Sequence, residues 1–224
     1  MILEIACFND ASCKNAHHLG ANRIELCEDY TSGGITPSLQ LARTCLKKTS
    51  CEVYAMIRPR SGDFIYSDTE FLLMKKQISE MKDLGVKGFV FGILDDHLKV
   101  NIEQNKALIQ LCAPLPCTFH RAFDLITDKA EALEALIHCG FKRILTSGGA
   151  GNAINNTTAL KDLQKQSGHR ISIIAGGGVR SGNLTELIKQ TGIKEFHSAA
   201  IVDPNTQTAD PNEIELLRTI LDRT

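Results

Sequence analysis

The run Thr118-Phe119-His120-Arg121-Ala122-Phe123-Asp124 brings a histidine, an arginine and an aspartate close together in the sequence. An imidazole exchanges protons near neutral pH, and a guanidinium binds carboxylate or phosphate oxygens. Burying arginine and aspartate is costly unless they are paired. Because the run follows the apolar segment Leu115-Pro116-Cys117, it is typical of the carboxyl-terminal end of a strand. We therefore expect His120 to lie at a functional strand end.

The run belongs to a pattern that covers the whole chain. Short strand-like segments alternate with longer helix-like segments eight times. The expected strands are 3–7, 23–27, 53–57, 88–91, 117–120, 143–146, 171–175 and 195–198. The expected helices lie near 10–19, 37–48, 68–84, 102–112, 128–139, 156–167, 181–190 and 211–222. Repeated βα units indicate a parallel sheet covered by helices. Eight of them predict a closed (β/α)₈ TIM barrel, with an open doubly wound sheet as the alternative. We expect residues 1–224 to form a single domain.

Polar and glycine-rich residues concentrate after the expected strands, where the reacting groups of such barrels lie. Side chains along a strand alternate between the barrel interior and the helix layer. If Ile24 and Leu26 face the helices, the inward residues of five strands are Glu4, Ala6, Arg23, Glu25, Cys27, Met56, Arg58, Thr118, His120, Glu195 and His197. The expected barrel mouth is therefore dense in ionisable groups.

This cluster can act in proton transfer, or it can be a structural network of ion pairs that fills the barrel. In the first interpretation the catalytic candidates are His120, Glu25, Glu4 and His197. Anion-binding candidates are the arginines, the strand-end polar residues and the glycine run, namely Arg58, Arg60, Arg121, Asp124, Ser147, Gly176, Gly177 and Gly178. Arg60 can instead pair with Asp63, and Arg121 with Asp124. The predicted chemistry is lyase, isomerase or hydrolase chemistry on a small anionic or phosphorylated metabolite.

The composition excludes several classes of partner. The 224 residues are 43% hydrophobic and 23% charged, with 25 basic and 26 acidic side chains and no basic block. Neither a nucleic-acid-binding footprint nor a polybasic membrane patch is present. The start Met1-Ile2-Leu3-Glu4 lacks the features of a signal peptide. None of the eight cysteines is spaced Cys-x-x-Cys, and we expect most of them to be reduced fillers in a cytoplasmic protein.

Several strings together resemble the CutC family, the copper homeostasis proteins. They are Glu4 in its strand, Arg23-Ile24-Glu25-Leu26-Cys27, Gly33-Gly34-Ile35-Thr36-Pro37-Ser38, Met56-Ile57-Arg58-Pro59-Arg60, the opening run and Glu195-Phe196-His197. The resemblance implies a (β/α)₈ barrel, a cytoplasmic location, copper binding and self-association into a homo-oligomer. One position departs from the family pattern: many members carry a cysteine where this chain has Ala6, and Cys7 comes one residue later.

Copper(I) prefers thiolate, thioether and imidazole ligands. The inward candidates are Cys27, Met56, His120 and His197, and Met56 and Cys27 can equally be barrel filling. Because Cys7 is expected to face the helix layer, a site built from paired cysteines of the first two strands is in doubt. Copper binding and an enzyme site for an anion are thus the two functional hypotheses, beside a non-catalytic scaffold.

Overall fold

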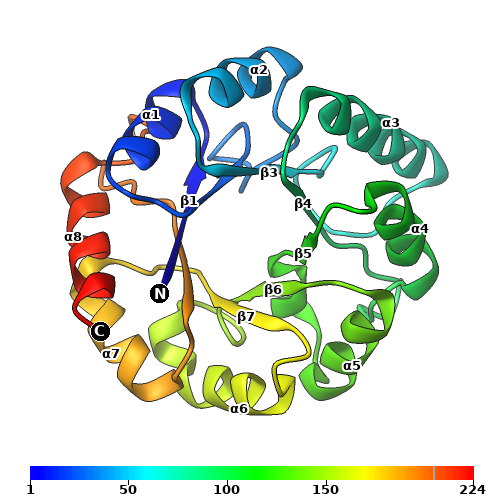
Figure 1. The fold of residues 1–224 in the computed structure, drawn as a ribbon. Coiled ribbons are helices and arrows are strands. Elements are labelled where there is room, and N and C mark those ends of the chain that lie inside the picture. Colours follow the sequence, from blue (N-terminus) through cyan, green and yellow to red (C-terminus); the bar gives the residue numbers. More distant parts are fainter. Residues whose placement is uncertain (204) are drawn as a thin grey trace.

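Eight parallel strands close into a barrel inside a ring of eight helices in the computed structural model, which describes residues 1–203 and 205–224 (Figure 1). The strands are β1 (Ile2–Cys7), β2 (Arg23–Leu26), β3 (Glu52–Met56), β4 (Gly88–Phe91), β5 (Cys117–Phe119), β6 (Arg143–Thr146), β7 (Ser172–Ala175) and β8 (Glu195–Ser198). Each strand pairs with the next in sequence, and β1 pairs with β8, where Glu4 lies opposite His197. The predicted TIM barrel is confirmed, and the open sheet is excluded.

The helices that cover the barrel are α1 (Asp10–His18), α2 (Leu39–Lys48), α3 (Asp68–Leu84), α4 (Ile102–Cys112), α5 (Lys129–Cys139), α6 (Thr157–Ser167), α7 (Ser181–Thr191) and α8 (Pro211–Asp222). Two short 3₁₀ helices, η1 (Arg121–Leu125) and η2 (Ala153–Asn156), were not expected from the sequence. Asp128 and Asp210 cap α5 and α8, while Gly85 and Gly140 end α3 and α5 in the left-handed conformation that suits glycine. Along the described ranges, no helix has the length and apolar character that crossing a bilayer requires.

Strand parity separates an apolar layer from a polar interior. Leu3, Ile5, Ile24 and Leu26 are fully buried in the large core between the strands and the helices. Glu4, Arg23 and Glu25 alternate with them and are buried inside the barrel. The predicted direction of these side chains is therefore observed, and the barrel interior is mainly polar.

The amino-terminal half of the barrel interior is filled by an ion-paired cluster that we call the floor, formed by Glu4, Arg23, Tyr54, Arg143 and Glu195. Arg23 pairs with Glu4, and its second terminal nitrogen lies 2.7 Å from Glu195. The Arg143 side chain lies 3.6 Å from the same Glu195 carboxylate. Both guanidinium groups stack on the Tyr54 ring, about 5 Å from its centroid. These groups pair with one another, although Nη1 of Arg143 is buried without a hydrogen-bond partner, and they leave the carboxyl-terminal half of the barrel for other roles.

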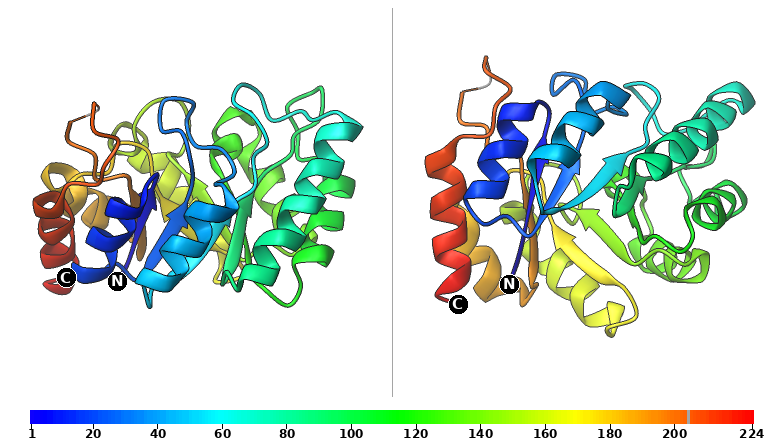
Figure 2. Two further views of the ribbon diagram at one scale, coloured as in Figure 1. Left: turned by 90° about the horizontal axis from the view of Figure 1, so that it is seen from above. Right: turned by 45° about the horizontal axis from the view of Figure 1, so that its top comes forward.

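The loops that follow the strands gather at one end of the molecule, and both chain ends lie at the other (Figure 2). A parallel barrel dictates this arrangement, because every strand points in the same direction. Residues far apart in sequence, from Ala6 to Ala199, therefore meet in one place at the carboxyl-terminal end of the barrel.

Candidate functional site

A cavity of about 270 Å³ opens at the carboxyl-terminal end of the barrel. Nine of the residues singled out from the sequence line it, namely Glu25, Cys27, Met56, Arg58, His120, Arg121, Gly177, Gly178 and His197. Phe64 and Arg180 also line it and were missed as site residues. Phe64 belongs to the loop after β3, and Arg180 follows the glycine run after β7, so loop position was the signal for both.

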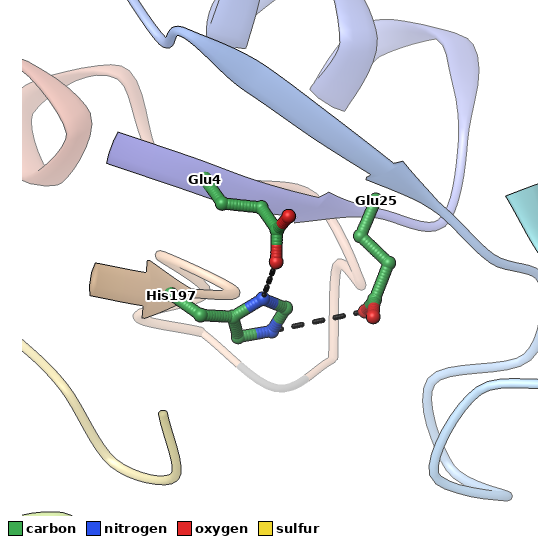
Figure 3. Close-up of side chains that lie close together, drawn as sticks. All are labelled: Glu4, Glu25 and His197. Atoms are coloured by element: carbon green, nitrogen blue, oxygen red, sulfur yellow. Dashed lines mark hydrogen bonds and ion pairs between the residues drawn. The ribbon is translucent and has the colours of Figure 1, made fainter. Parts of the chain in front are cut away.

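His197 lines the cavity and lies between two carboxylates (Figure 3). Its Nδ1 lies 2.7 Å from Oε1 of Glu4, and its Nε2 lies 3.8 Å from Oε2 of Glu25. The other oxygen of Glu4 pairs with Arg23 in the floor. Among the described residues, these three form the one group of at least three His, Cys, Asp or Glu side chains with mutually close donor atoms, all within 4.8 Å.

Electrostatics fix the charge of this group. Burial alone would lower the pKa of His197, but the Glu25 and Glu4 carboxylates outweigh it and raise that pKa. Burial raises the pKa of Glu4, yet Arg23 and His197 oppose it and hold the pKa at about 2. Burial raises the pKa of Glu25, and the charge of Glu4 adds to the effect while His197 opposes it. Glu4 is therefore a fixed anion that orients an imidazolium.

Among the described residues, Cys27 is the only cysteine that lines the cavity, and its thiol lies beside Glu25 of the Glu4–His197–Glu25 group. Its Sγ lies 3.5 Å from Oε2 of Glu25, and it packs with Met56 in a small apolar cluster. Burial and the Glu25 charge raise the pKa of the Cys27 thiol well above its usual value. Ala6 also lines the cavity, whereas Cys7 is buried in the helix layer as parity predicted. The mouth therefore offers one thiol and not two.

His120 is a neutral hydrogen-bond donor on the opposite wall. Its Nδ1 accepts the backbone N–H of Ala122 at 3.3 Å, while its Nε2 is buried without a partner. Burial and the positive charge of Arg58 lower the pKa of His120 to about 3. Because the ring is neutral and Nδ1 accepts, its proton resides on Nε2. His120 therefore presents an unsatisfied N–H, and its ring packs against Phe64 with 4.7 Å between centroids.

Arg58 and Arg180 hold the cavity loops by contacts to uncharged groups. Arg58 donates to the carbonyls of Ser32 and Gly34 at 3.1 Å and of Gly62 at 2.9 Å, and it stacks on Phe64. Arg180 donates to the carbonyls of Val179 and Ile201 and to the hydroxyl of Ser198, at 2.8 to 3.1 Å. Neither guanidinium has a carboxylate within ion-pair distance among the described residues.

Arg121 and Asp124 form an ion pair at the rim of the cavity, which is the alternative that the sequence analysis gave for Arg121. Nε of Arg121 lies 2.8 Å from Oδ2 of Asp124, whose oxygens also accept the backbone N–H and the hydroxyl of Ser147. The Thr146 hydroxyl donates to the same carboxylate. Arg121 still lines the cavity and is half exposed, whereas Asp124 and Ser147 lie behind it.

Arg60 lies outside the cavity wall, although the sequence placed it among the anion-binding candidates. It lies 2.9 Å from Asp63 and also pairs with Glu70 at the start of α3. The pair between Arg60 and Asp63 is the alternative that the sequence analysis had left open. Arg60 therefore fastens the loop after β3 to a helix and does not face the site.

The glycine run after β7 makes room for the protein's own side chains. A Cβ at Gly176 would approach Leu145 to 2.5 Å, and one at Gly178, where φ is +72°, would approach Asn152 to 2.6 Å. The amino terminus of α7 is already occupied by a carboxylate, since Glu213 accepts the N–H and the hydroxyl of Ser181 at 2.7 and 2.8 Å. The helix dipole therefore meets an internal anion here.

Known proteins resemble the chain in sequence and in structure. The sequence model described as "CutC family" matches residues 1–202. A CutC family protein of Mesorhizobium japonicum is 44% identical over 85% of this chain and 74% of its own length. A human protein named "Copper homeostasis protein cutC homolog" is 40% identical over 89% of this chain and 73% of its own length. The crystal structure of CutC from Streptococcus agalactiae has a TM-score of 0.85 and 31% identity, and covers 89% of this chain and 98% of that one.

Proposed function

The chain belongs to the CutC family, and from this premise we propose that it acts in copper homeostasis by binding a copper ion in the barrel mouth. The ion is the cargo of the protein, and the proposed ligands are Cys27, His197 and Glu25. The observation that carries the proposal is that the Cys27 thiol lies 3.5 Å from Glu25, which lies 3.8 Å from the His197 imidazole.

The chemistry of these groups fits a copper site with a single thiolate. Copper(I) favours sulfur and imidazole donors, and Met56 adds a thioether to the same wall. The Glu4 carboxylate on Nδ1 of His197 leaves Nε2 directed toward Glu25, an orientation that carboxylates commonly impose on metal-binding histidines. Binding requires that the Cys27 thiol and the His197 imidazolium each lose a proton. We therefore expect affinity to rise with pH.

Two features refine the ligand set expected from the sequence. Ala6 stands where many family members have a cysteine, so a second thiolate is missing from the cavity wall. His120 holds its proton on Nε2, because Nδ1 accepts from Ala122, and this tautomer has no lone pair to offer the cavity. We therefore assign His197, and not His120, as the imidazole ligand.

A competition titration tests the proposal. The protein is titrated without oxygen against a coloured copper(I) chelator, together with Cys27→Ser and His197→Gln. Cys45→Ser is the matched control, because Cys45 is equally buried but lies in the helix layer. We expect one equivalent of copper(I) to bind, and each site variant to bind at least about tenfold more weakly. Equal affinities for the wild type, Cys27→Ser and Cys45→Ser would contradict the proposal.

We also propose a cytoplasmic location and self-association as a homo-oligomer, both of which the family resemblance suggests. Leu72 and Leu73 of α3 and Leu216 of α8 are exposed apolar side chains that could be covered in an oligomer. Cell fractionation tests the location, and light scattering gives the mass in solution. A monomer mass at every concentration would contradict the second proposal.

A further inference from the structure

The cavity wall carries uncompensated positive charge. His197 is balanced by Glu4 and Glu25, and Arg121 by Asp124. Arg58 and Arg180 remain, and each donates only to carbonyl or hydroxyl oxygens. Two guanidinium groups with no carboxylate partner within the described chain therefore line the cavity, Arg58 buried and Arg180 partly buried. Burying a guanidinium group, even in part, costs free energy unless an anion pairs with it.

Two unsatisfied donors lie on the same wall. His120 is 3% exposed, and its Nε2–H has no acceptor. Nε of Arg58, a residue that is 7% exposed, is likewise buried without a partner. Nearly all buried donors in proteins find an acceptor, so two that line one cavity indicate a missing acceptor. The aromatic ring of Phe64 contacts both groups and keeps them on one side of the cavity.

We propose that Arg58 and His120, with Arg180 on another part of the same cavity lining, bind the carboxylate or phosphate group of a small organic anion. Guanidinium and imidazole N–H groups are strong donors to both kinds of oxyanion. The cavity of about 270 Å³ limits the ligand to a small molecule. This binding goes beyond copper homeostasis and does not depend on Cys27 or Glu25, which line the cavity from β2 and the loop that follows it.

The position of this wall distinguishes it from a helix-dipole phosphate site. The amino terminus of α7 already receives the Glu213 carboxylate, which is 8% exposed. The glycines before it are packed against Ser147 and Asn152. An incoming anion therefore meets arginine and histidine side chains from β3, β5 and β7 loops and not backbone N–H groups at a helix start.

The test is a titration of histidine-¹⁵N-labelled protein followed by NMR. Inorganic phosphate and acetate are added in separate series at constant ionic strength. The His120 Nε2 resonance is followed in the wild-type protein first, so that anion binding is measured without any substitution. The variant Arg180→Gln removes one cation of the wall. Arg170→Gln is its matched control, because Arg170 pairs with Glu134 on the outer surface.

We expect a saturable shift of the His120 Nε2 signal with at least one of the two anions, and about tenfold weaker binding in Arg180→Gln but not in Arg170→Gln. The anion that saturates first identifies the carboxylate or phosphate class. The proposal is overturned if neither anion gives a saturable shift, or if both arginine variants weaken binding equally. Cys27→Ser should keep anion binding, so failure of the copper site and failure of this site give different results.

Discussion

Gly92 lies directly against the ring of His120. A Cβ added at Gly92 would come within 2.7 Å of Nδ1 of His120 and 3.0 Å of the Phe119 ring. Gly92 follows β4 and His120 follows β5, so the two residues face each other across neighbouring strand ends. The absence of a side chain at Gly92 thus sets the position from which His120 presents its free N–H.

Gly92→Ala should displace His120. The added methyl group must push the imidazole away from its hydrogen bond with Ala122, and overpacking of this kind costs about 1–3 kcal/mol of unfolding free energy. Urea denaturation and the His120 NMR signal measure the two effects. Gly182→Ala is the control, since nothing lies within 4 Å of a Cβ there and alanine is favoured over glycine in a helix, so we expect the protein to be at least as stable as the wild type. A wild-type His120 signal in Gly92→Ala would contradict the expectation.

Ala6→Cys should strengthen copper(I) binding. The new thiol would line the cavity with Cys27 and allow two sulfur ligands, which copper(I) prefers. We expect a gain of at least about tenfold, or about 1.4 kcal/mol, in the chelator competition. Ala55→Cys is a matched control, because Ala55 is equally buried on β3 but packs in the helix layer. An equal gain in the control would show that cysteine number, and not position, sets the affinity.

Glu4→Gln should destabilise the whole barrel. Glu4 is fully buried and pairs with both Arg23 and His197, so the substitution removes one carboxylate from each of two buried cations and leaves Arg23 with Glu195 and His197 with Glu25. Removing one member of a buried ion pair costs about 3–5 kcal/mol. The surface change Glu134→Gln breaks an exposed pair with Arg170 and should cost about 0–1 kcal/mol. Urea unfolding at neutral pH compares them, and similar losses in the two variants would rule out the floor as a source of stability.

Acid should destabilise the protein partly through His120. The folded-state pKa of His120 is lowered to about 3, whereas the unfolded chain protonates near pH 6.5. Between these values the unfolded state binds more protons, so the free energy of unfolding falls as the pH falls from about 6.5 toward 3. The shift corresponds to a loss on the order of a few kcal/mol. His120→Gln should flatten this part of the pH profile of urea unfolding, and parallel profiles for the two proteins would contradict the assignment.

The barrel could be predicted from the sequence because every level of pattern agreed. Eight alternating segments gave the architecture, and strand parity correctly turned Glu4, Glu25 and His197 inward and Cys7 outward. The predicted strand ends differ from the observed ones by single residues. Three predicted carboxyl ends, Cys27, Ile57 and His120, already belong to the loops, and the starts of β1, β3 and β7 also differ by one residue.

The pairing of side chains within the mouth could not be predicted. Parity brings Glu4, Glu25 and His197 to the interior, but only three-dimensional register places one histidine between two acids. For Arg60 the sequence left anion binding and pairing with Asp63 both open, and it gave no indication of the second pair with Glu70. Glu213 gave no local signal at all, because the helix start that it caps lies on another βα unit.

The floor of Glu4, Arg23, Tyr54, Arg143 and Glu195 has a consequence for substitutions at the mouth. Arg23, Glu195, Arg143 and Tyr54 contact one another and do not line the cavity, so a substitution at Ala6 leaves these contacts in place. The residues that tie the strands together and the residues that line the mouth are therefore largely separate sets, joined through the Glu4–His197 pair.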